Sequence, residues 1–294
     1  MSIRFLTVIV ASSTLWQTMS NSAENQPEAQ RTPLLKLFVS EFVSITPGQG
    51  QFPKSFSMGA AAGPAEEQPP RTVTFKYNFE IAKYEVPQNL YQAVMGENPS
   101  RWKGPRNSVE MMNWTQANQF CQRITTQLQK AKLIDANQRV RLPTEAEWEY
   151  CCRAGTTTAY SFGNAARKAD DKDKKASLLD PYAWHTGNAA GNDPPVGAKK
   201  PNPWGLYDMH GYLWEFVQDR WKNDYRGAPQ DGSAVTADSK QRVARGGSWK
   251  DDFTQLRSTA RRAINQDDPA GKSDRGDEIG FRCVLVRTSG NSAP

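Results

Sequence analysis

The segment Pro201-Asn-Pro-Trp-Gly-Leu-Tyr-Asp-Met-His-Gly-Tyr-Leu-Trp-Glu-Phe216 combines aromatic residues, glycines and carboxylates in one short stretch. Gly205 and Gly211 permit tight turns and positive φ angles. Asp208 and Glu215 can therefore face one centre, with main-chain carbonyls between them. Oxygen ligands from a short irregular loop are those that Ca²⁺ takes. The same spacing also fits a buried turn whose carboxylates accept backbone N–H groups. Spacing alone leaves both interpretations open.

The whole chain has 294 residues and a formal net charge of +6. Its length permits one large domain or two small ones. The basic excess is spread out, and the run 167–175 mixes Lys with Asp, which is typical of a solvated loop rather than a nucleic-acid surface. Neither a Gly-x-Gly-x-x-Gly motif nor a phosphate-binding Gly-Lys-Ser/Thr motif is present. We therefore expect no nucleic acid among its partners.

The first 23 residues have the organisation of a secretory signal peptide. Arg4 precedes an apolar run to about Trp16, and small residues follow. The apolar run is too short to span a bilayer, and no later segment is apolar enough to do so. We expect an exported protein, periplasmic or secreted, without a membrane span.

The remaining chain divides into a linker, one domain and a tail. Residues 24–33 are polar and contain prolines, which predicts a linker. Residues 34–288 then form the folded domain, and residues 289–294 form the tail. Most of residues 156–204 is predicted to be loop.

Periodicity predicts short elements throughout this domain. Apolar residues at helical spacing predict a helix over Asn113–Ala131 and a shorter one over Gln88–Met95. A further helix begins after Pro143, where Thr144 and Glu147 form a capping box that satisfies orphan N–H groups. Alternating or short apolar runs predict strands over residues 38–45, 56–59, 72–79, 81–86, 140–142, 242–249 and 279–286.

The chain contains four cysteines, Cys121, Cys151, Cys152 and Cys283. We interpret them as small buried thiols. An exported chain permits disulfides, so a bridge from Cys121 or Cys152 to Cys283 stays open.

Several motifs follow one another in a characteristic order: Pro143-Thr-Glu-Ala-Glu-Trp-Glu-Tyr150, Gly205-Leu-Tyr-Asp-Met209, Gly211-Tyr-Leu-Trp-Glu-Phe216, Arg245-Gly-Gly-Ser-Trp249 and Gly280-Phe-Arg282. Together they resemble the sulfatase-modifying factor family, which is the family of the formylglycine-generating enzyme. The resemblance covers about residues 38–286. It implies a single irregular α+β domain of the C-type-lectin-like kind, with little regular secondary structure and bound calcium.

The resemblance also implies particular calcium ligands. The family's better-kept site falls here on two side chains and two main-chain carbonyls, those of Asp208, Glu215, Gly211 and Leu213. The family's other site would begin near Asn188, in a loop that is shortened here. Tyr212 replaces the usual Asn of the motif, so we expect the turn and the neighbouring groove to differ. Calcium is the expected cofactor.

The formylglycine-generating enzyme oxidises a cysteine within a Cys-x-Pro-x-Arg segment of a sulfatase, using O₂ and a copper(I) ion held by two cysteines. Soft thiolates suit Cu(I). Asp251 and Leu256 stand roughly where these cysteines belong, and no cysteine lies between Cys152 and Cys283. The resemblance therefore implies the fold without the copper-binding pair, and copper is not expected to bind.

Three functions are compatible with these observations. The preferred one is an exported, non-catalytic binding or scaffolding module stabilised by calcium. The alternative is a formylglycine-generating oxidase or sulfatase-maturation factor, with a sulfatase as its protein partner. The third is a different catalytic activity, in which charged residues after Trp249 form the active site and act in acid–base chemistry. No catalytic residue is assigned.

Substrate contact is expected in the segment that begins at Trp249, with the candidates Trp249, Asp251, Asp252, Arg257 and Arg261. Trp249 fits a groove wall and a core position equally well. Arg257 and Arg261 are four residues apart and can clamp a carboxylate or a sulfate. In the competing interpretation, Arg261 and Arg282 are buried ion-pair partners that hold irregular loops together.

Overall fold

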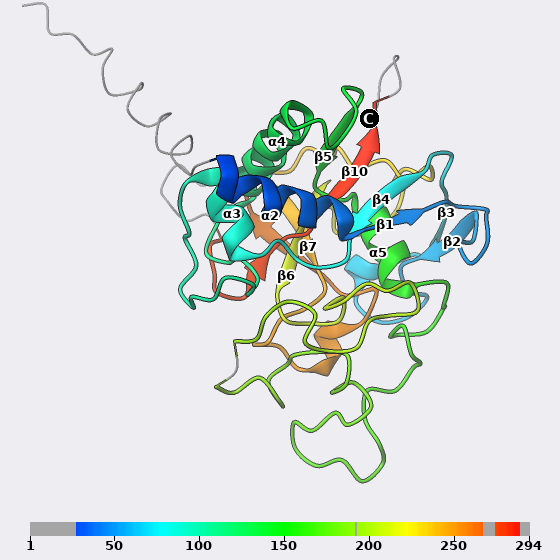
Figure 1. The fold of residues 1–294 in the computed structure, drawn as a ribbon. Coiled ribbons are helices and arrows are strands. Elements are labelled where there is room, and N and C mark those ends of the chain that lie inside the picture. Colours follow the sequence, from blue (N-terminus) through cyan, green and yellow to red (C-terminus); the bar gives the residue numbers. More distant parts are fainter. Residues whose placement is uncertain (1–27, 192, 267–273, 289–294) are drawn as a thin grey trace, which may run out of the picture.

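The computed structural model describes residues 28–191, 193–266 and 274–288. The expected signal peptide and tail lie outside these residues. Helices and sheets gather in one part of the molecule, and the loops that follow Arg153 form the other part (Figure 1). Among the described residues, no helix or strand lies between Arg153 and Trp214. This arrangement confirms the single irregular α+β domain predicted from the sequence.

The first sheet is antiparallel and has the strand order β1-β4-β10-β5. Its strands are β1 (Phe42–Ile45), β4 (Phe79–Ala82), β10 (Val284–Arg287) and β5 (Gln138–Arg141). Ile81 pairs with both Val43 and Val284, so the beginning and the end of the domain meet on β4.

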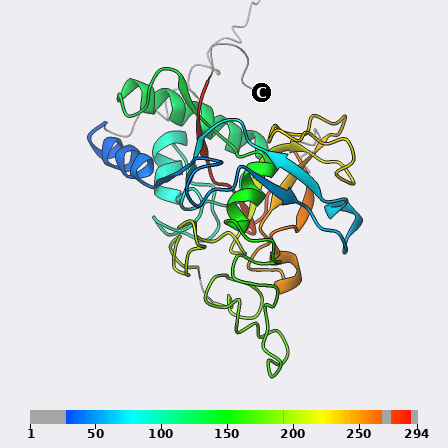
Figure 2. The same cartoon turned by 90° about the vertical axis from the view of Figure 1, so that its right-hand side faces the viewer.

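The second sheet has the order β8-β7-β6-β9. It contains β8 (Arg261–Asn265), β7 (Gln241–Arg245), β6 (Trp214–Arg220) and β9 (Ile279–Gly280), of which β6 and β9 are parallel. A separate hairpin pairs β2 (Ser55–Met58) with β3 (Arg71–Thr74) and projects from the side of the molecule (Figures 1 and 2). Two short 3-10 helices, η1 (Ala65–Glu67) and η2 (Phe253–Leu256), lie in the connecting loops.

The three predicted helices are confirmed: α3 (Gln88–Met95), α4 (Trp114–Lys130) and α5 (Glu145–Arg153). At the start of α5, the Thr144 side chain accepts from the Glu147 N–H, and the Glu147 carboxylate accepts from the Thr144 N–H. Asn113 and Gln116 form the same reciprocal cap at the start of α4. Each cap satisfies donors that a helix end leaves unpaired, which explains why these boundaries were predictable.

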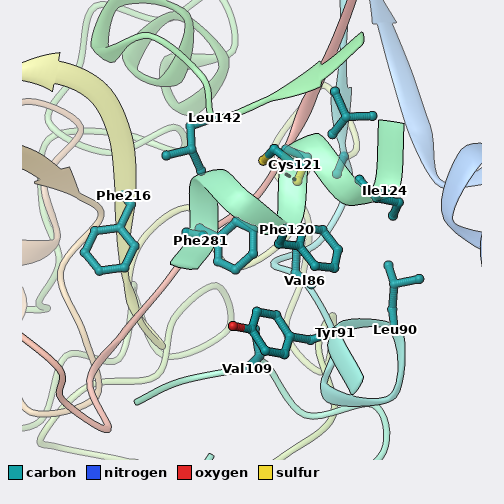
Figure 3. Close-up of a cluster of buried hydrophobic side chains, with 14 of the residues drawn as sticks. Val86, Leu90, Tyr91, Val109, Phe120, Cys121, Ile124, Leu142, Phe216 and Phe281 are labelled. Atoms are coloured by element: carbon teal, nitrogen blue, oxygen red, sulfur yellow. Dashed lines mark hydrogen bonds between the residues drawn. The ribbon is translucent and has the colours of Figure 1, made fainter. Parts of the chain in front are cut away.

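The core packs α3 and α4 against the two sheets. Tyr91 and Phe120 stack with ring centroids 5.5 Å apart, and Phe281 meets Phe120 edge to face (Figure 3). A second cluster lies around α5, where Trp148 and Tyr150 are buried. All four cysteines are buried and free. The Cys121 and Cys283 sulfurs lie 3.8 Å apart, whereas Cys152 contacts His210 and Ser258 instead.

The predictions for residues 28–45 were wrong in part. Helix α2 (Glu28–Ser40) occupies the second half of the expected linker and the first residues of the expected strand. Leu35 and Phe38 are buried in the core, and the Phe38 ring meets Phe42 edge to face at 4.9 Å. The helix therefore forms because it covers the core with these apolar residues, despite a polar beginning that contains Pro33.

The observed strands differ from the predicted ones in two further respects. The single strand predicted over residues 279–286 is two strands. Strand β9 pairs with β6 in the second sheet, and the chain then crosses to the first sheet, where β10 pairs with β5. Strands β6 and β8 were not predicted, because their residues were interpreted as ligands and groove. No helix within the described ranges has both the length and the apolar character needed to cross a bilayer.

Candidate functional site

An aromatic cavity of about 190 Å³ lies among the loops near Trp249. Its walls include the rings of Trp102, Trp184, Tyr212 and Trp249. Three carboxylates also line it, those of Glu110, Asp193 and Asp277. We refer to this cavity as the aromatic pocket. A concave site with apolar walls and a few polar groups is the usual form of a small-ligand site.

The walls of the aromatic pocket are held by main-chain contacts. The Trp249 N–H donates to the Tyr212 carbonyl and its indole N–H donates to the Asp277 carbonyl, both at 2.9 Å. Tyr212 has a φ of +76°, which is unusual for a bulky residue. Its hydroxyl donates to the Pro194 carbonyl at 2.7 Å. The residue that replaces the usual Asn therefore lines the pocket and ties down the loop that faces it.

Glu110 is the most buried carboxylate of the pocket, with 3% of its surface exposed. Its Oε1 accepts the Trp102 N–H at 3.0 Å, whereas its Oε2 accepts no hydrogen bond from a described residue. Burial raises the pKa of Glu110 to about 7, and the charges of Asp277 and Asp193 act in the same direction, against the amides of Trp102 and Arg101. A carboxylate with a raised pKa in a cleft is a typical functional group.

The other two carboxylates are better satisfied. Asp277 pairs with Lys250, and with Arg101 at 3.2 Å. Burial opposes its ionisation, but the Lys250 ammonium, the Trp102 indole and the Arg101 guanidinium together outweigh this effect and hold the pKa of Asp277 below its usual value. Asp193 accepts from the Asn107 amide and from the Tyr212 hydroxyl. Glu110 is therefore the least satisfied acid of the three.

The predicted calcium residues lie in a second, fully buried group. Asp208 Oδ2 accepts the Gly197 N–H at 2.8 Å, whereas Oδ1 has no partner in the described part of the chain. Glu85 lies nearby: its Oε1 accepts the Leu213 N–H at 3.2 Å, and its Oε2 is likewise unbonded. Burial raises the pKa of Asp208 to about 6. Burial, together with the charges of Glu215 and Asp208, raises the pKa of Glu85 well above its usual value.

Glu215 differs from these two acids because Arg282 satisfies it. The guanidinium donates two hydrogen bonds of 2.6 Å to its oxygens, and the Trp148 indole donates a third at 2.8 Å. Arg282 is thus a buried ion-pair partner, as one of the two interpretations of the sequence held.

The donor set fits a calcium ion in part. Among the described residues, no cluster of three or more His, Cys, Asp or Glu side chains has metal-binding geometry, so a cation would also need main-chain carbonyls, as the predicted set with Gly211 and Leu213 does. The unbonded oxygens of Asp208 and Glu85 fit such an ion. The Asn188 amide fits less well, since its oxygen accepts the His185 N–H and its nitrogen donates to Asp180 and Ala183.

The predicted contact segment serves mainly structure. Asp251 Oδ2 accepts from the Trp214 indole at 2.8 Å and from the Ser248 N–H at 2.9 Å. Asp252 caps η2 by accepting the Thr254 N–H. Arg257 forms a two-bond pair with Glu67, and Arg261 forms one with Glu145. Of the five predicted contact residues, only Trp249 lines the aromatic pocket.

Sequence reasoning missed Glu110, Trp102, Trp184 and Glu85 as site residues. A signal existed for Glu110, which is an isolated carboxylate within the apolar segment Val109-Glu-Met-Met112. Glu85 lay in a segment that was used only as a landmark of the resemblance.

The fold and its buried ion pairs define a domain of the formylglycine-generating-enzyme type. Residues 30–287 match the model of the sulfatase-modifying factor enzyme 1-like domain, and the chain belongs to that family. This confirms the resemblance inferred from the motifs.

Relatives in sequence include the formylglycine-generating enzyme of Mycobacterium tuberculosis, 32% identical over 51% of this chain and 52% of that protein. The enzyme of Mus musculus is 32% identical over 49% of this chain and 38% of its own length. Chaperone protein LppX of Paenibacillus barcinonensis is 28% identical over 58% of this chain and 69% of that protein. The chain thus spans about half or less of the length of these two enzymes.

Similar solved structures cover more of the chain. PvdO from Pseudomonas aeruginosa matches with a TM-score of 0.66 and 28% identity over 83% of this chain and 94% of that chain. Treponema denticola variable protein 1 matches with a TM-score of 0.67 and 27% identity over 84% of this chain and 94% of that chain.

Proposed function

We propose that this chain is an exported, non-catalytic binding module of the sulfatase-modifying factor family, stabilised by one calcium ion. This proposal rests on the residues at the two positions that stand roughly where the family's copper-binding cysteines belong. Asp251 is bonded to Trp214 and Ser248. Leu256 is fully buried in an apolar cluster. Neither side chain offers the soft ligand that Cu(I) requires.

Calcium enters the proposal through Asp208 and Glu85. Two buried carboxylate oxygens without partners are unfavourable next to a third acid. A divalent cation that binds them together with the Gly211 and Leu213 carbonyls would satisfy both oxygens and stabilise the folded state by mass action. We assign Glu215 the role of fixing this loop through Arg282.

The alternative function is formylglycine generation or sulfatase maturation. The 32% identity to formylglycine-generating enzymes favours it, and a sulfatase would then be the partner. The two proposals differ in whether this chain performs chemistry on a cysteine.

A turnover assay separates them. The chain, loaded with copper in air, is incubated with a Cys-x-Pro-x-Arg peptide beside an active family oxidase, and mass spectrometry follows the aldehyde. We expect no conversion and no stoichiometric Cu(I) binding. Conversion to the aldehyde would establish the alternative. Export is tested separately by N-terminal sequencing of secreted material, which we expect to begin after residue 23; a start at Met1 would contradict export.

A further inference from the structure

The Glu110 carboxylate is the acidic group of the aromatic pocket that lacks a partner at one oxygen; the Ser108 hydroxyl and the Trp184 indole N–H, which also line the pocket, are likewise unbonded within the described residues. The residue lines the cavity and is nearly fully buried. One oxygen accepts the Trp102 N–H, and the other is unbonded within the described part of the chain. A buried acceptor without a donor destabilises a folded protein. A ligand that donates one hydrogen bond here would remove that cost.

The surrounding rings favour a positive charge. Each tryptophan of the pocket already holds one of the protein's own cations. Lys199 Nζ lies 3.9 Å from the Trp184 ring centroid, and Lys250 Nζ lies 5.1 Å from that of Trp249. The Arg101 guanidinium lies 4.8 Å from the Trp102 ring. Aromatic faces attract cations in this way because of their quadrupoles.

The charge balance of the pocket points in the same direction. Arg101 and Lys250 both pair with Asp277, and Lys250 also pairs with Glu278. Neither Glu110 nor Asp193 has an ion-pair partner among the residues that the structure describes; their hydrogen bonds come from neutral amides and a hydroxyl. Glu110 and Asp193 are therefore the carboxylates of the cavity with which a bound cation can pair.

We propose that the aromatic pocket binds a primary ammonium group, which donates a hydrogen bond to Glu110 Oε2 while the tryptophan rings surround it. This inference rests on the proposed binding role and names the ligand class for it. Guanidinium fits less well, because its paired donors match two free oxygens and Oε1 is already engaged. A quaternary ammonium has no N–H to donate, so it would leave Oε2 unbonded.

Two sources can present this group, a lysine side chain of a protein partner and a free alkylamine. Tryptophan fluorescence or calorimetry of the calcium-loaded full chain distinguishes them with defined probes. The probes are n-butylammonium, its neutral analogue n-butanol, choline, and a short peptide blocked at both ends that contains one lysine or, in its place, one arginine.

We expect saturable binding of n-butylammonium, at least tenfold tighter than that of n-butanol or choline. We also expect the lysine peptide to bind more tightly than the arginine peptide. A lysine peptide that binds more tightly than n-butylammonium identifies a protein partner; equal affinities identify the amine itself as the ligand. Glu110→Gln should weaken the binding of n-butylammonium and that of the lysine peptide by at least tenfold. Asp135→Asn, which removes an exposed carboxylate paired with Arg287, should change neither.

Equal binding of n-butanol and n-butylammonium would overturn the proposal, and so would tighter binding of choline. This comparison uses the unmodified chain, so it does not depend on the folding of Glu110→Gln. A folded Glu110→Gln chain, shown by its melting curve, that retains full affinity would also overturn it. Failure of amine binding without aldehyde formation rejects only the ligand class, whereas aldehyde formation rejects the non-catalytic role itself.

Discussion

The contact segment Trp249–Arg261 and the aromatic pocket both carry charged side chains, but they differ in how those charges are satisfied. In the segment, Arg257 and Arg261 each form two hydrogen bonds with a glutamate. In the pocket, Glu110 keeps one unbonded oxygen. The same contrast separates Glu215 from Asp208. Charge density in a sequence therefore does not show which polar atoms stay without a hydrogen bond after folding.

The largest effect is expected from breaking a satisfied pair. Arg261→Ala removes the two-bond partner of Glu145, and both side chains are buried. We expect a loss of about 3–5 kcal/mol in the free energy of unfolding, because the buried carboxylate keeps only the Arg245 guanidinium at 3.7 Å and the Tyr225 hydroxyl. Urea denaturation measures it, with Arg226→Ala as the control, since that arginine forms an exposed pair with Asp224. A loss no larger than that of the control would mean that Arg261 is not structural.

The next effect concerns the unsatisfied acids of the calcium group. Burial raises the pKa of Asp208 to about 6. Between about pH 4 and this value, the folded chain holds more protons than the unfolded chain, so its stability falls as the pH rises. Without calcium, we expect a loss of about 2–3 kcal/mol between pH 4 and pH 7. Denaturation in EDTA across this range tests the sign, and rising stability would contradict the assignment.

In the aromatic pocket, the affinity for an amine should rise with pH, whereas stability falls with pH. This change in affinity should be the smaller of the two. Its titratable groups are Glu110, Asp193 and Asp277, of which Asp277 pairs with Lys250 and Arg101. Burial raises the pKa of Glu110 to about 7, while an alkylammonium ion stays charged below about pH 10. We expect n-butylammonium to bind up to tenfold more weakly per pH unit below about pH 7. Titrations at pH 5.5 and pH 8 measure this change, and equal affinities would exclude Glu110 as the partner.

The smallest effect is expected where one cap is removed. Asp252 accepts the Thr254 N–H at the start of η2. Asp252→Ala should cost about 1 kcal/mol, the usual loss when a helix cap is removed. Its amine affinity should not change, because Asp252 does not line the pocket. Thermal unfolding and the fluorescence titration give both values, and a loss of amine affinity would return this segment to the site.

Local signals determined which parts of the fold could be predicted. The starts of α4 and α5 depend on reciprocal caps three residues apart, so the sequence contains them. Helix α2 depends instead on Leu35 and Phe38 reaching a distant core. The sites also combine local and distant residues. Asp208 and Glu215 lie in one sequence motif, whereas Glu85, which accepts the Leu213 N–H, lies 128 residues before Leu213. An oxygen left unbonded is a property of the folded chain, so the isolated carboxylate Glu110 in its apolar segment signals burial but not a missing hydrogen bond.

The most direct test of whether unbonded buried oxygens mark ligand sites is a calcium titration by calorimetry at pH 8. The chain is first stripped with EDTA and compared with Asp208→Asn and Asp135→Asn. We predict one calcium ion per chain for the wild type and for Asp135→Asn, and at least tenfold weaker binding for Asp208→Asn. No bound calcium in the wild type, with the same melting temperature in EDTA and in excess Ca²⁺, would contradict a calcium site at Asp208 and Glu85.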